Sequence, residues 1–174
     1  ASPFIQPDKP FEFVNNYFIG NNQAQWASDC KVFQAITYKN VYPNIDIRYY
    51  SSSGNLKYDF IVRPGGNPKA ITLQYDGPKL AIKNKNLVIT TPVGEVKELY
   101  PYSYQSYDGK PKEVASEFVL KENTVSIALK EYNPLETLII DPSIIFSTFS
   151  GSTAQNWGYT ATPGPDGSLY GGGI

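Results

Sequence analysis

The sequence predicts an all-β protein, an antiparallel β-sandwich or meander domain followed by the first strands of a second β unit. Its 174 residues include 14 Tyr and 9 Phe but only 18% charged residues, a mixture that suits half-buried pleated surfaces. The 14 Gly and 14 Pro residues supply frequent turns and discourage long helices. Short β runs recur along the chain, separated by Asp-Gly, Lys-Asn or Pro-containing turns.

Residues 1–38 predict an N-terminal arm and the first strands. The first ten residues contain three prolines and little periodicity, which is typical of an extended segment. From Phe11, "FEFVNNYFIGNNQAQW" predicts a strand, an Asn/Gly turn and a second strand, with one helical turn near residues 22–28. The single cysteine, Cys30, excludes an internal disulfide and is expected to be a small buried side chain.

Residues 39–142 predict the main β domain, which opens with a hairpin inside "VYPNIDIRYYSSSGNLKYDFIVRPGGNPKAITLQYDG". The side chains of the outgoing strand alternate between two faces. Ile45, Ile47 and Tyr49 form the apolar face, and Asp46, Arg48 and Tyr50 form the more solvent-exposed face. The return strand alternates too, and its apolar face is made by Leu56, Tyr58, Phe60 and Val62. Gly54 and Asn55 suit the turn between them, and later hairpin turns are predicted at residues 83–86 and 108–109.

The composition changes near Asp141-Pro142, where residues 143–174 become rich in Gly, Ser and Thr. A segment so poor in aliphatic side chains cannot form its own core. We therefore expect it either to pack on the first domain or to begin a repeated architecture.

Three stretches carry a resemblance to a known family: the residue 41–77 segment, "LVITTPVGEVKELYPYSYQ" and "LIIDPSIIFSTFSGS". They resemble the N-terminal β domain that precedes β-propeller-type (SBBP) repeats in large bacterial surface and secreted proteins. The tail, with Trp157-Gly158-Tyr159 and Asp166 to Gly172, resembles the first such repeat. It is most similar to Bacteroidota members that end in a gliding-motility-associated, type B sorting domain for type IX secretion.

The resemblance implies an exported, extracellular or cell-surface protein with a role in adhesion or gliding motility, and it brings no catalytic motif. Through its parent chain, the expected partners are an outer-membrane PorP/SprF-type protein and the type IX translocon. Our leading hypothesis is a non-enzymatic module that caps the repeat array and presents a binding surface. The physical motive is that an open repeat array exposes a strand edge, which a preceding β domain can cover.

An enzyme is not expected, because the absence of histidine removes the usual general base, the Ser-His-Asp and Cys-His systems and the commonest zinc ligand. The least favoured alternative is a glycoside hydrolase with two facing carboxylates. Its candidates sit in no recognisable motif: Asp46, Asp59, Asp76, Glu95, Glu98, Asp108, Glu117 and Asp141. No cofactor is expected; calcium is the cation that Asp/Asn-rich loops would suit, although no DxDxDG loop occurs.

Two further partner classes are not expected. A net charge of −1 provides no excess of positive charge to neutralise nucleic-acid phosphates. No apolar run approaches the ~20 residues that a transmembrane helix needs.

The second function class is carbohydrate binding by "ELYPYSYQSYDG", because exposed aromatic rings stack on sugar faces. The candidate ligand-binding residues are Tyr100, Tyr102, Tyr104 and Tyr107, and the expected ligand is a surface glycan. These tyrosines nearly alternate, so we expect one row to be exposed and the other to belong to the core. The competing interpretation is a cross-strand aromatic ladder that only stabilises the sheet.

Overall fold

The structure is a computed structural model that describes residues 4–52, 55–92, 94–146, 158–163 and 169–173. It confirms the predicted fold class: the described chain is all-β and its strands pair antiparallel. Helical structure within these residues is confined to two short 3-10 turns, η1 (Gln23–Gln25) and η2 (Pro68–Ala70). The first of them lies where the sequence predicts a helical turn.

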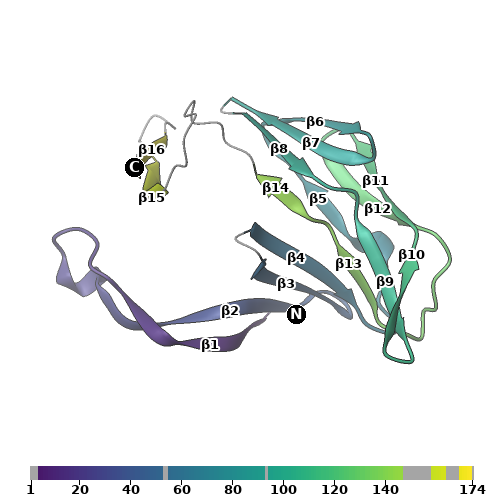
Figure 1. The fold of residues 1–174 in the computed structure, drawn as a ribbon, viewed down its shortest axis with the longest axis horizontal. Coiled ribbons are helices and arrows are strands. Elements are labelled where there is room, and N and C mark those ends of the chain that lie inside the picture. Colours follow the sequence, from purple (N-terminus) through teal and green to yellow (C-terminus); the bar gives the residue numbers. More distant parts are fainter. Residues whose placement is uncertain (1–3, 53–54, 93, 147–157, 164–168, 174) are drawn as a thin grey trace.

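The largest sheet has seven strands in the order β1-β2-β3-β4-β13-β9-β10. Their bounds are β1 (Phe4–Tyr17), β2 (Ala27–Tyr42), β3 (Ile45–Ser52), β4 (Asn55–Val62), β13 (Leu138–Asp141), β9 (Tyr102–Tyr107) and β10 (Lys110–Val114). Figure 1 shows that β1 and β2 leave the body as a long curved hairpin, called the arm below. The other five strands form one layer of the body.

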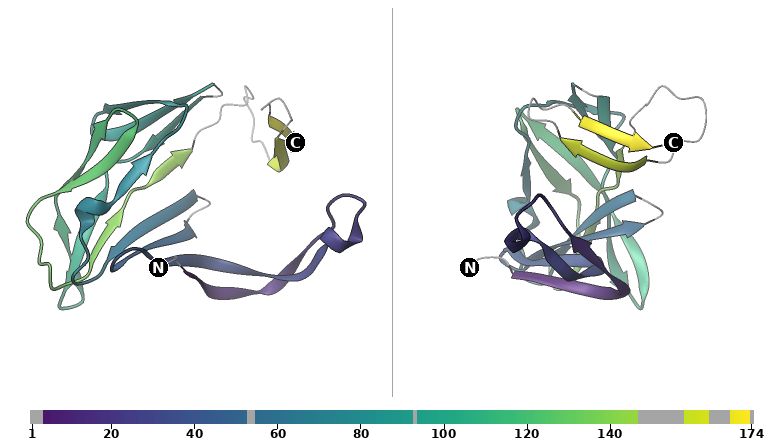
Figure 2. Two further views of the ribbon diagram at one scale, coloured as in Figure 1. Left: turned by 180° about the vertical axis from the view of Figure 1, so that it is seen from behind. Right: turned by 90° about the vertical axis from the view of Figure 1, so that its left-hand side faces the viewer.

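Two smaller sheets complete the body. One contains β11 (Ser116–Lys121), β12 (Thr124–Leu129) and β5 (Thr72–Gln74), and the other contains β14 (Ile144–Phe146), β8 (Gly94–Glu98), β7 (Asn86–Thr91) and β6 (Lys79–Lys83). A separate hairpin, β15 (Gly158–Pro163) and β16 (Leu169–Gly173), lies on the side of the body from which the arm extends (Figure 1, and from behind in Figure 2). That this hairpin begins a propeller-type repeat remains a prediction.

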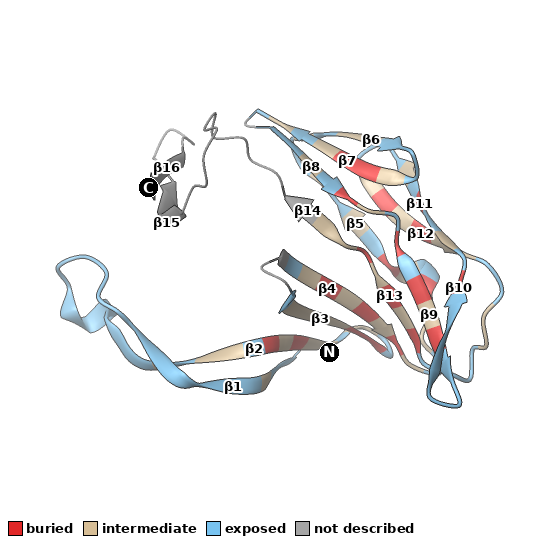
Figure 3. Ribbon diagram, in the orientation of Figure 1, coloured by how far each residue is buried: buried red, intermediate tan, exposed pale blue. Residues whose placement is uncertain are grey.

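The core lies between the seven-stranded sheet and the two smaller sheets. One side is supplied by the apolar face of β4 and β13, and Ile45 of β3 extends it. The smaller sheets supply Leu87, Phe118, Val125 and Ile127. The apolar alternation predicted for β3 and β4 is therefore confirmed, and this side of the large sheet is called the inner face below. Buried residues cluster at this junction, whereas β1 is exposed along nearly its whole length and β2 is exposed toward the tip of the arm (Figure 3).

Two strand segments pass from one sheet to another at buried prolines. β8 continues through Pro101 into β9, and β13 continues through Pro142 into β14. The two segments stay paired across the switch, since β8 pairs with β14, β9 pairs with β13, and Leu99 N donates to Ser143 O at 2.8 Å. Strands that switch sheets in this way form the corners of a sandwich.

The predicted hairpin turns are confirmed where the structure describes them. Asn84 and Lys85 both have positive φ between β6 and β7, as do Asp108 and Gly109 between β9 and β10. Gly54, predicted for the turn between β3 and β4, lies outside the described residues. Two expectations are wrong: Cys30 is half-buried on the arm, and Asp46 on the supposed more solvent-exposed face is fully buried.

Candidate functional site

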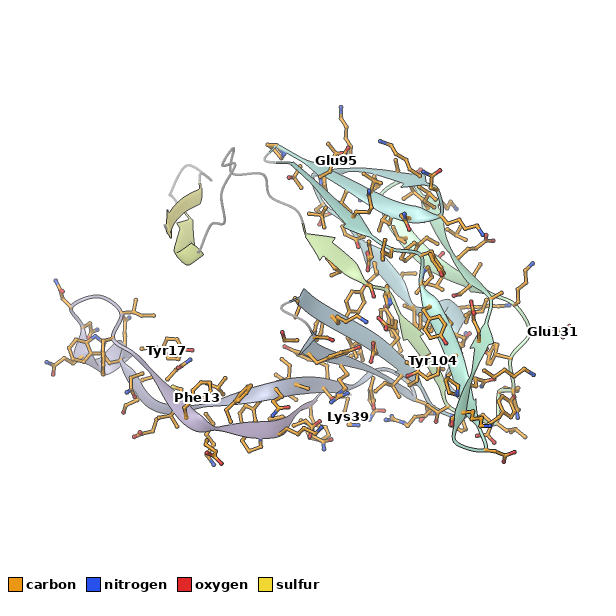
Figure 4. The ribbon with its side chains drawn as sticks, viewed as in Figure 1. Phe13, Tyr17, Lys39, Glu95, Tyr104 and Glu131 are labelled. Atoms are coloured by element: carbon orange, nitrogen blue, oxygen red, sulfur yellow. The ribbon has the colours of Figure 1, made fainter. Side chains whose placement is uncertain are left out.

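The arm carries the largest group of exposed apolar side chains in the described chain. β1 and the tip contribute Phe4, Ile5, Phe11, Phe13, Val14, Tyr17, Phe18, Ile19 and Trp26. Figure 4 shows Phe13 and Tyr17 rising from the side of the arm that faces β4 and β14. A two-stranded hairpin is marginally stable by itself, and exposed apolar patches of this kind mark interaction surfaces. The arm is therefore the first part of the candidate site.

Irregular pairing makes the arm curve. Between Pro10 and Val14 β1 advances four residues, while β2 advances two from Phe33 to Lys31. A second irregularity follows at Asp29, whose φ is 56° and whose backbone N–H donates to Asn16 Oδ1 at 2.8 Å. Bulges bend a strand and increase its twist, so the sequence builds the curvature of the arm into β1 and β2.

The tip of the arm has a defined local structure. Asn22 caps η1 by accepting a hydrogen bond from Ala24 N at 3.1 Å. Trp26 Nε1 donates to Gly20 O at 3.1 Å, and its ring meets Phe18 edge-on with centroids 5.2 Å apart. Because the indole N–H is already satisfied, these rings can be buried against a partner without losing a hydrogen bond.

The inner face of the large sheet continues beyond the smaller sheets and is left uncovered by the described residues. An apolar groove of about 460 Å³ lies there, lined by Ile36, Tyr38, Val41, Ile47, Tyr49 and Leu56. It is called the inner-face groove below. It adjoins a cavity of about 390 Å³ that shares Ile47 and Tyr49 and is also lined by Ile144 of β14. The groove is thus an exposed extension of the core itself.

The root of the arm is held by Asp46, which is 1% exposed. Its carboxylate accepts hydrogen bonds from Lys39 Nζ at 3.0 Å, from Asn40 N at 2.9 Å and from the Arg63 guanidinium. Burial raises the pKa of Asp46, but the Asn40 amide and the two cations outweigh it and hold the pKa below its ordinary value. The cluster joins β2, β3 and the end of β4 at the point where the arm leaves the body.

A glycine completes this root. Asn40 has φ 54° within a bulge of β2, and Arg63 Nη2 donates to Asn40 Oδ1 at 2.6 Å. A Cβ on Gly66 would lie 3.0 Å from the carbonyl oxygens of Arg63 and Asn44, so a side chain there would crowd two backbone carbonyls. The Pro-Gly-Gly-Asn-Pro corner is therefore packed against the root of the arm.

A buried carboxylate lies at the deep end of the groove system. Glu98 of β8 is 1% exposed, and it accepts hydrogen bonds from the hydroxyls of Tyr58 and, at 3.3 Å, Tyr75. Burial raises the pKa of Glu98, and the two hydrogen bonds oppose this only in part. All three side chains line the cavity that adjoins the inner-face groove.

The four sequence-predicted tyrosines do not form one site. Tyr102 and Tyr104 lie together on β9, with ring centroids 5.5 Å apart and ring planes inclined by 31°. They line a hollow of about 490 Å³ together with Ser106, Gly109, Pro111 and Asp141. Tyr107 lies with Lys112 in a different hollow, and Tyr100 precedes β9. The expectation that one row of these tyrosines belongs to the core is wrong, since Tyr104 is half-buried and the others are exposed.

Two of the sequence-predicted carboxylates meet on the outer face of the large sheet. The pairing of Ile140 with Phe60 places Asp141 of β13 directly across from Asp59 of β4. Lys57 Nζ contacts Asp141 Oδ2 at 2.9 Å, and the Tyr50 hydroxyl donates to Asp59 Oδ1 at 3.1 Å. Burial and then the Asp141 carboxylate raise the pKa of Asp59 to about 6. The remaining candidates of the set are dispersed over turns and separate strands.

Within the described ranges, no three His, Cys, Asp or Glu side chains gather as a group that could hold a metal ion. The calcium site and the carboxylate-pair hydrolase remain predictions. Among the helical turns that the structure describes, none is long and apolar enough to cross a membrane.

Sequence reasoning included Asp46 and Glu98 among the candidate carboxylates but missed that both are buried, although Glu98 carried a signal. Val96 and Glu98 are two residues apart on β8, so a strict alternation places Glu98 on the same face as Val96. The surroundings of Asp46 come from three segments that are separate in the sequence, which alternation within one strand cannot reveal.

Comparison with known proteins assigns the chain to a family. No curated protein and no solved structure matches the chain. The family described as a domain of unknown function (DUF7948) matches residues 1–143. Because this match spans well over half of the 174 residues, the protein belongs to the DUF7948 family.

Proposed function

We propose that this chain is a non-enzymatic, extracellular module of a larger surface protein, and that its arm and inner-face groove pack on the repeats that follow in the chain. The observation that carries the proposal is the uncovered part of the inner face. The apolar face that forms the core at Phe60 continues to Ile47 and Tyr49 and then to Ile5, which is exposed. A face continuous with the core needs a cover from elsewhere.

The chain after β14 is the occupant that the geometry favours. Ile144 of β14 lines the cavity that adjoins the groove, and β14 is the last strand of the body. The chain that follows β14 is covalently tethered here, so its effective concentration at the groove exceeds that of a separate partner protein. The β15–β16 hairpin lies on the same side of the body as the arm, which agrees with this choice (Figure 1).

Such packing would cap the repeat array. β1 is an edge strand with unpaired backbone groups, and a repeated β architecture also has an open edge. Covering these two strand edges would remove two places at which another chain could pair and aggregate. The resemblance to SBBP-repeat proteins supports the rest of the proposal: export by type IX secretion, a place at the cell surface, a role in adhesion or gliding motility, and an outer-membrane PorP/SprF-type partner.

Thermal unfolding of the parent protein tests the proposal with two matched substitutions. Leu56 is 59% exposed in the inner-face groove, and Leu135 is 77% exposed on a loop outside it. Leu56→Asp should lower the melting temperature of the repeats and speed tryptic cleavage after residue 146, whereas Leu135→Asp should change neither. Equal behaviour of the two variants, or unchanged repeat stability after deletion of residues 1–142, contradicts the proposal.

A further inference from the structure

The hollow beside Tyr102 and Tyr104 has the composition of a sugar-binding site. We propose that it binds a neutral, pyranose-containing saccharide, with the two rings as a stacking platform and Asp141 as a hydroxyl acceptor. This site lies on the outer face of the large sheet. The proposal is independent of the packing of the arm and the inner-face groove.

The two rings form the apolar part of the site. Tyr102 is 38% exposed and Tyr104 is half-buried, and the 31° inclination between their planes makes a shallow bent surface. Sugar rings present C–H groups on their faces, and aromatic rings offer a large rigid apolar surface for them. Nothing lies within 4 Å of a Cβ built on Gly109, so the end of the hollow at the β9–β10 turn is open.

Asp141 supplies the polar part. It pairs directly with Tyr102 across β13 and β9, and its carboxylate contacts Lys57 Nζ at 2.9 Å and Ser143 Oγ at 3.4 Å. A carboxylate has about four lone-pair positions, so it can still accept hydrogen bonds from ligand hydroxyls. An acceptor beside a stacking platform is the combination that orients a polyhydroxylated ring.

The charge of this region selects against acidic sugars. Asp59 lies across from Asp141 on one side and from Arg48 on the other, and Arg48 is also paired with Asp8. Three carboxylates therefore share the two cations Lys57 and Arg48. The region therefore has an excess negative charge at neutral pH. Neutral hydroxyl donors are attracted to it, whereas uronic acids would be repelled.

The alternative explanation, that these rings only stabilise the sheet, predicts a different arrangement of the tyrosines. A cross-strand aromatic ladder would need rings on neighbouring strands, but Tyr102 and Tyr104 are two residues apart on the same strand. Among the described residues, no third aromatic ring contacts this pair. The exposed parts of the two rings therefore face the hollow.

Titration calorimetry with the whole chain tests the proposal. The probes are the neutral hexasaccharides of glucose, mannose and xylose, with hexagalacturonic acid as the acidic comparison. We expect at least one neutral probe to bind, and Tyr102→Ala or Tyr104→Ala to weaken it about tenfold, the effect of losing ~1.4 kcal/mol of contact. Tyr104→Phe retains the ring and should retain most of the affinity.

Tyr100→Ala and Tyr107→Ala are the matched controls, because both remove a tyrosine exposed outside the hollow. They should bind like the wild type, and circular dichroism verifies the fold of every variant. The proposal is overturned if no neutral probe binds at millimolar concentration, if hexagalacturonic acid binds more tightly, or if the control variants lose as much affinity as the Tyr102 and Tyr104 variants.

Discussion

The hydroxyl of Tyr58 donates a hydrogen bond to the carboxylate of Glu98, and this contact joins two different sheets. Tyr58 belongs to β4 of the seven-stranded sheet, and Glu98 belongs to β8 of the four-stranded sheet. Tyr75, which directly follows β5 of the three-stranded sheet, donates to the other carboxylate oxygen at 3.3 Å. One buried carboxylate therefore ties together all three sheets of the body.

Glu98→Gln should stabilise the protein at alkaline pH. Burial raises the pKa of Glu98, so the folded state favours the protonated carboxyl. The contribution of this carboxyl to stability is therefore largest below its ordinary pKa of 4.5. That contribution is lost as the pH rises through the raised pKa. Glutamine is neutral at all these pH values; its amide oxygen can accept from one tyrosine hydroxyl while its amide nitrogen donates to the other hydroxyl oxygen. Thermal unfolding should show a higher melting temperature than the wild type at pH 8 and little difference at pH 4.

Glu95→Gln on the same strand is the control, because Glu95 is exposed and its nearest cation, Lys83, is 4.0 Å away. It should behave like the wild type at both pH values. A destabilised Glu98→Gln at pH 8 would show that the ionised carboxylate is the form that the fold prefers.

Asp59→Asn should also stabilise the fold near neutral pH, for a different reason. Burial and the facing Asp141 carboxylate raise the pKa of Asp59 to about 6. Above that pH the ionised carboxylate lowers the stability of the folded state. This destabilisation disappears as the pH falls toward the ordinary pKa of 3.8. Asparagine keeps the acceptor for the Tyr50 hydroxyl. We expect a gain of about 1 kcal/mol at pH 8, after allowance for solvent screening, and none at pH 4.

Chemical unfolding at the two pH values measures this difference. Asp108→Asn serves as the control, because Asp108 is exposed in a turn with φ 48°, a conformation that asparagine tolerates equally well. An identical pH profile for Asp59→Asn and the wild type would mean that Asp59 titrates normally.

Asp46→Asn should loosen the root of the arm. The substitution retains the acceptor for Asn40 N but removes the charge that pairs with Lys39 and Arg63. We expect a loss of roughly 1–3 kcal/mol and faster hydrogen exchange of the β1–β2 amides. Because the pKa of Asp46 is lowered, its contribution is present above the ordinary value of 3.8 and is lost as the pH falls through the lowered value.

The exposed ion pair of the arm provides the comparison. Arg48 Nη2 contacts Asp8 Oδ2 at 3.0 Å, but both side chains are about a third or more exposed. Asp8→Asn should cost less than ~1 kcal/mol, as exposed pairs do. If the two substitutions accelerated exchange in the arm equally, Asp46 would have no special role at its root.

Gln105→Leu should destabilise the loop between β12 and β13. The Gln105 side chain is 1% exposed, and its amide nitrogen donates to Asn133 O at 2.8 Å and Glu136 O at 3.2 Å. Its oxygen accepts from Asn133 N at 2.8 Å. Leucine leaves Asn133 N and Glu136 O without these partners, whereas Asn133 O still accepts from Glu136 N at 3.2 Å. Denaturant unfolding should therefore report a loss of about 2–4 kcal/mol. A loss below ~0.5 kcal/mol would mean that water replaces the amide.

Local patterns in the sequence were sufficient for the strands and turns. The alternation from Ile45 to Tyr49 and from Tyr58 to Val62 predicts the inner face, because one side of a strand packs on the core. The turn at Asp108-Gly109 follows from its residues, since both adopt positive φ.

Contacts between distant segments could not be predicted in this way. β13 inserts between β4 and β9, and no local property of Leu138–Asp141 specifies those neighbours. The same limit applies to the candidate site. Tyr102 and Tyr104 share a hollow, as their spacing of two suggests, but Asp141 reaches it only because β13 pairs with β9. The groove depends on where the smaller sheets end, which is a property of the whole fold.

Photo-crosslinking in the parent protein tests the packing of the arm most directly. Benzoylphenylalanine at Ile5 places the probe on the inner face, because Ile5 pairs with Tyr38, whereas the adjacent Gln6 pairs with Thr37 on the outer face. We predict that the Ile5 probe forms intramolecular crosslinks to residues after 146 and that the Gln6 probe does not. Crosslinks from Ile5 only to other chains, or equal yields from the two positions, would contradict the proposal that the arm packs on the repeats that follow it.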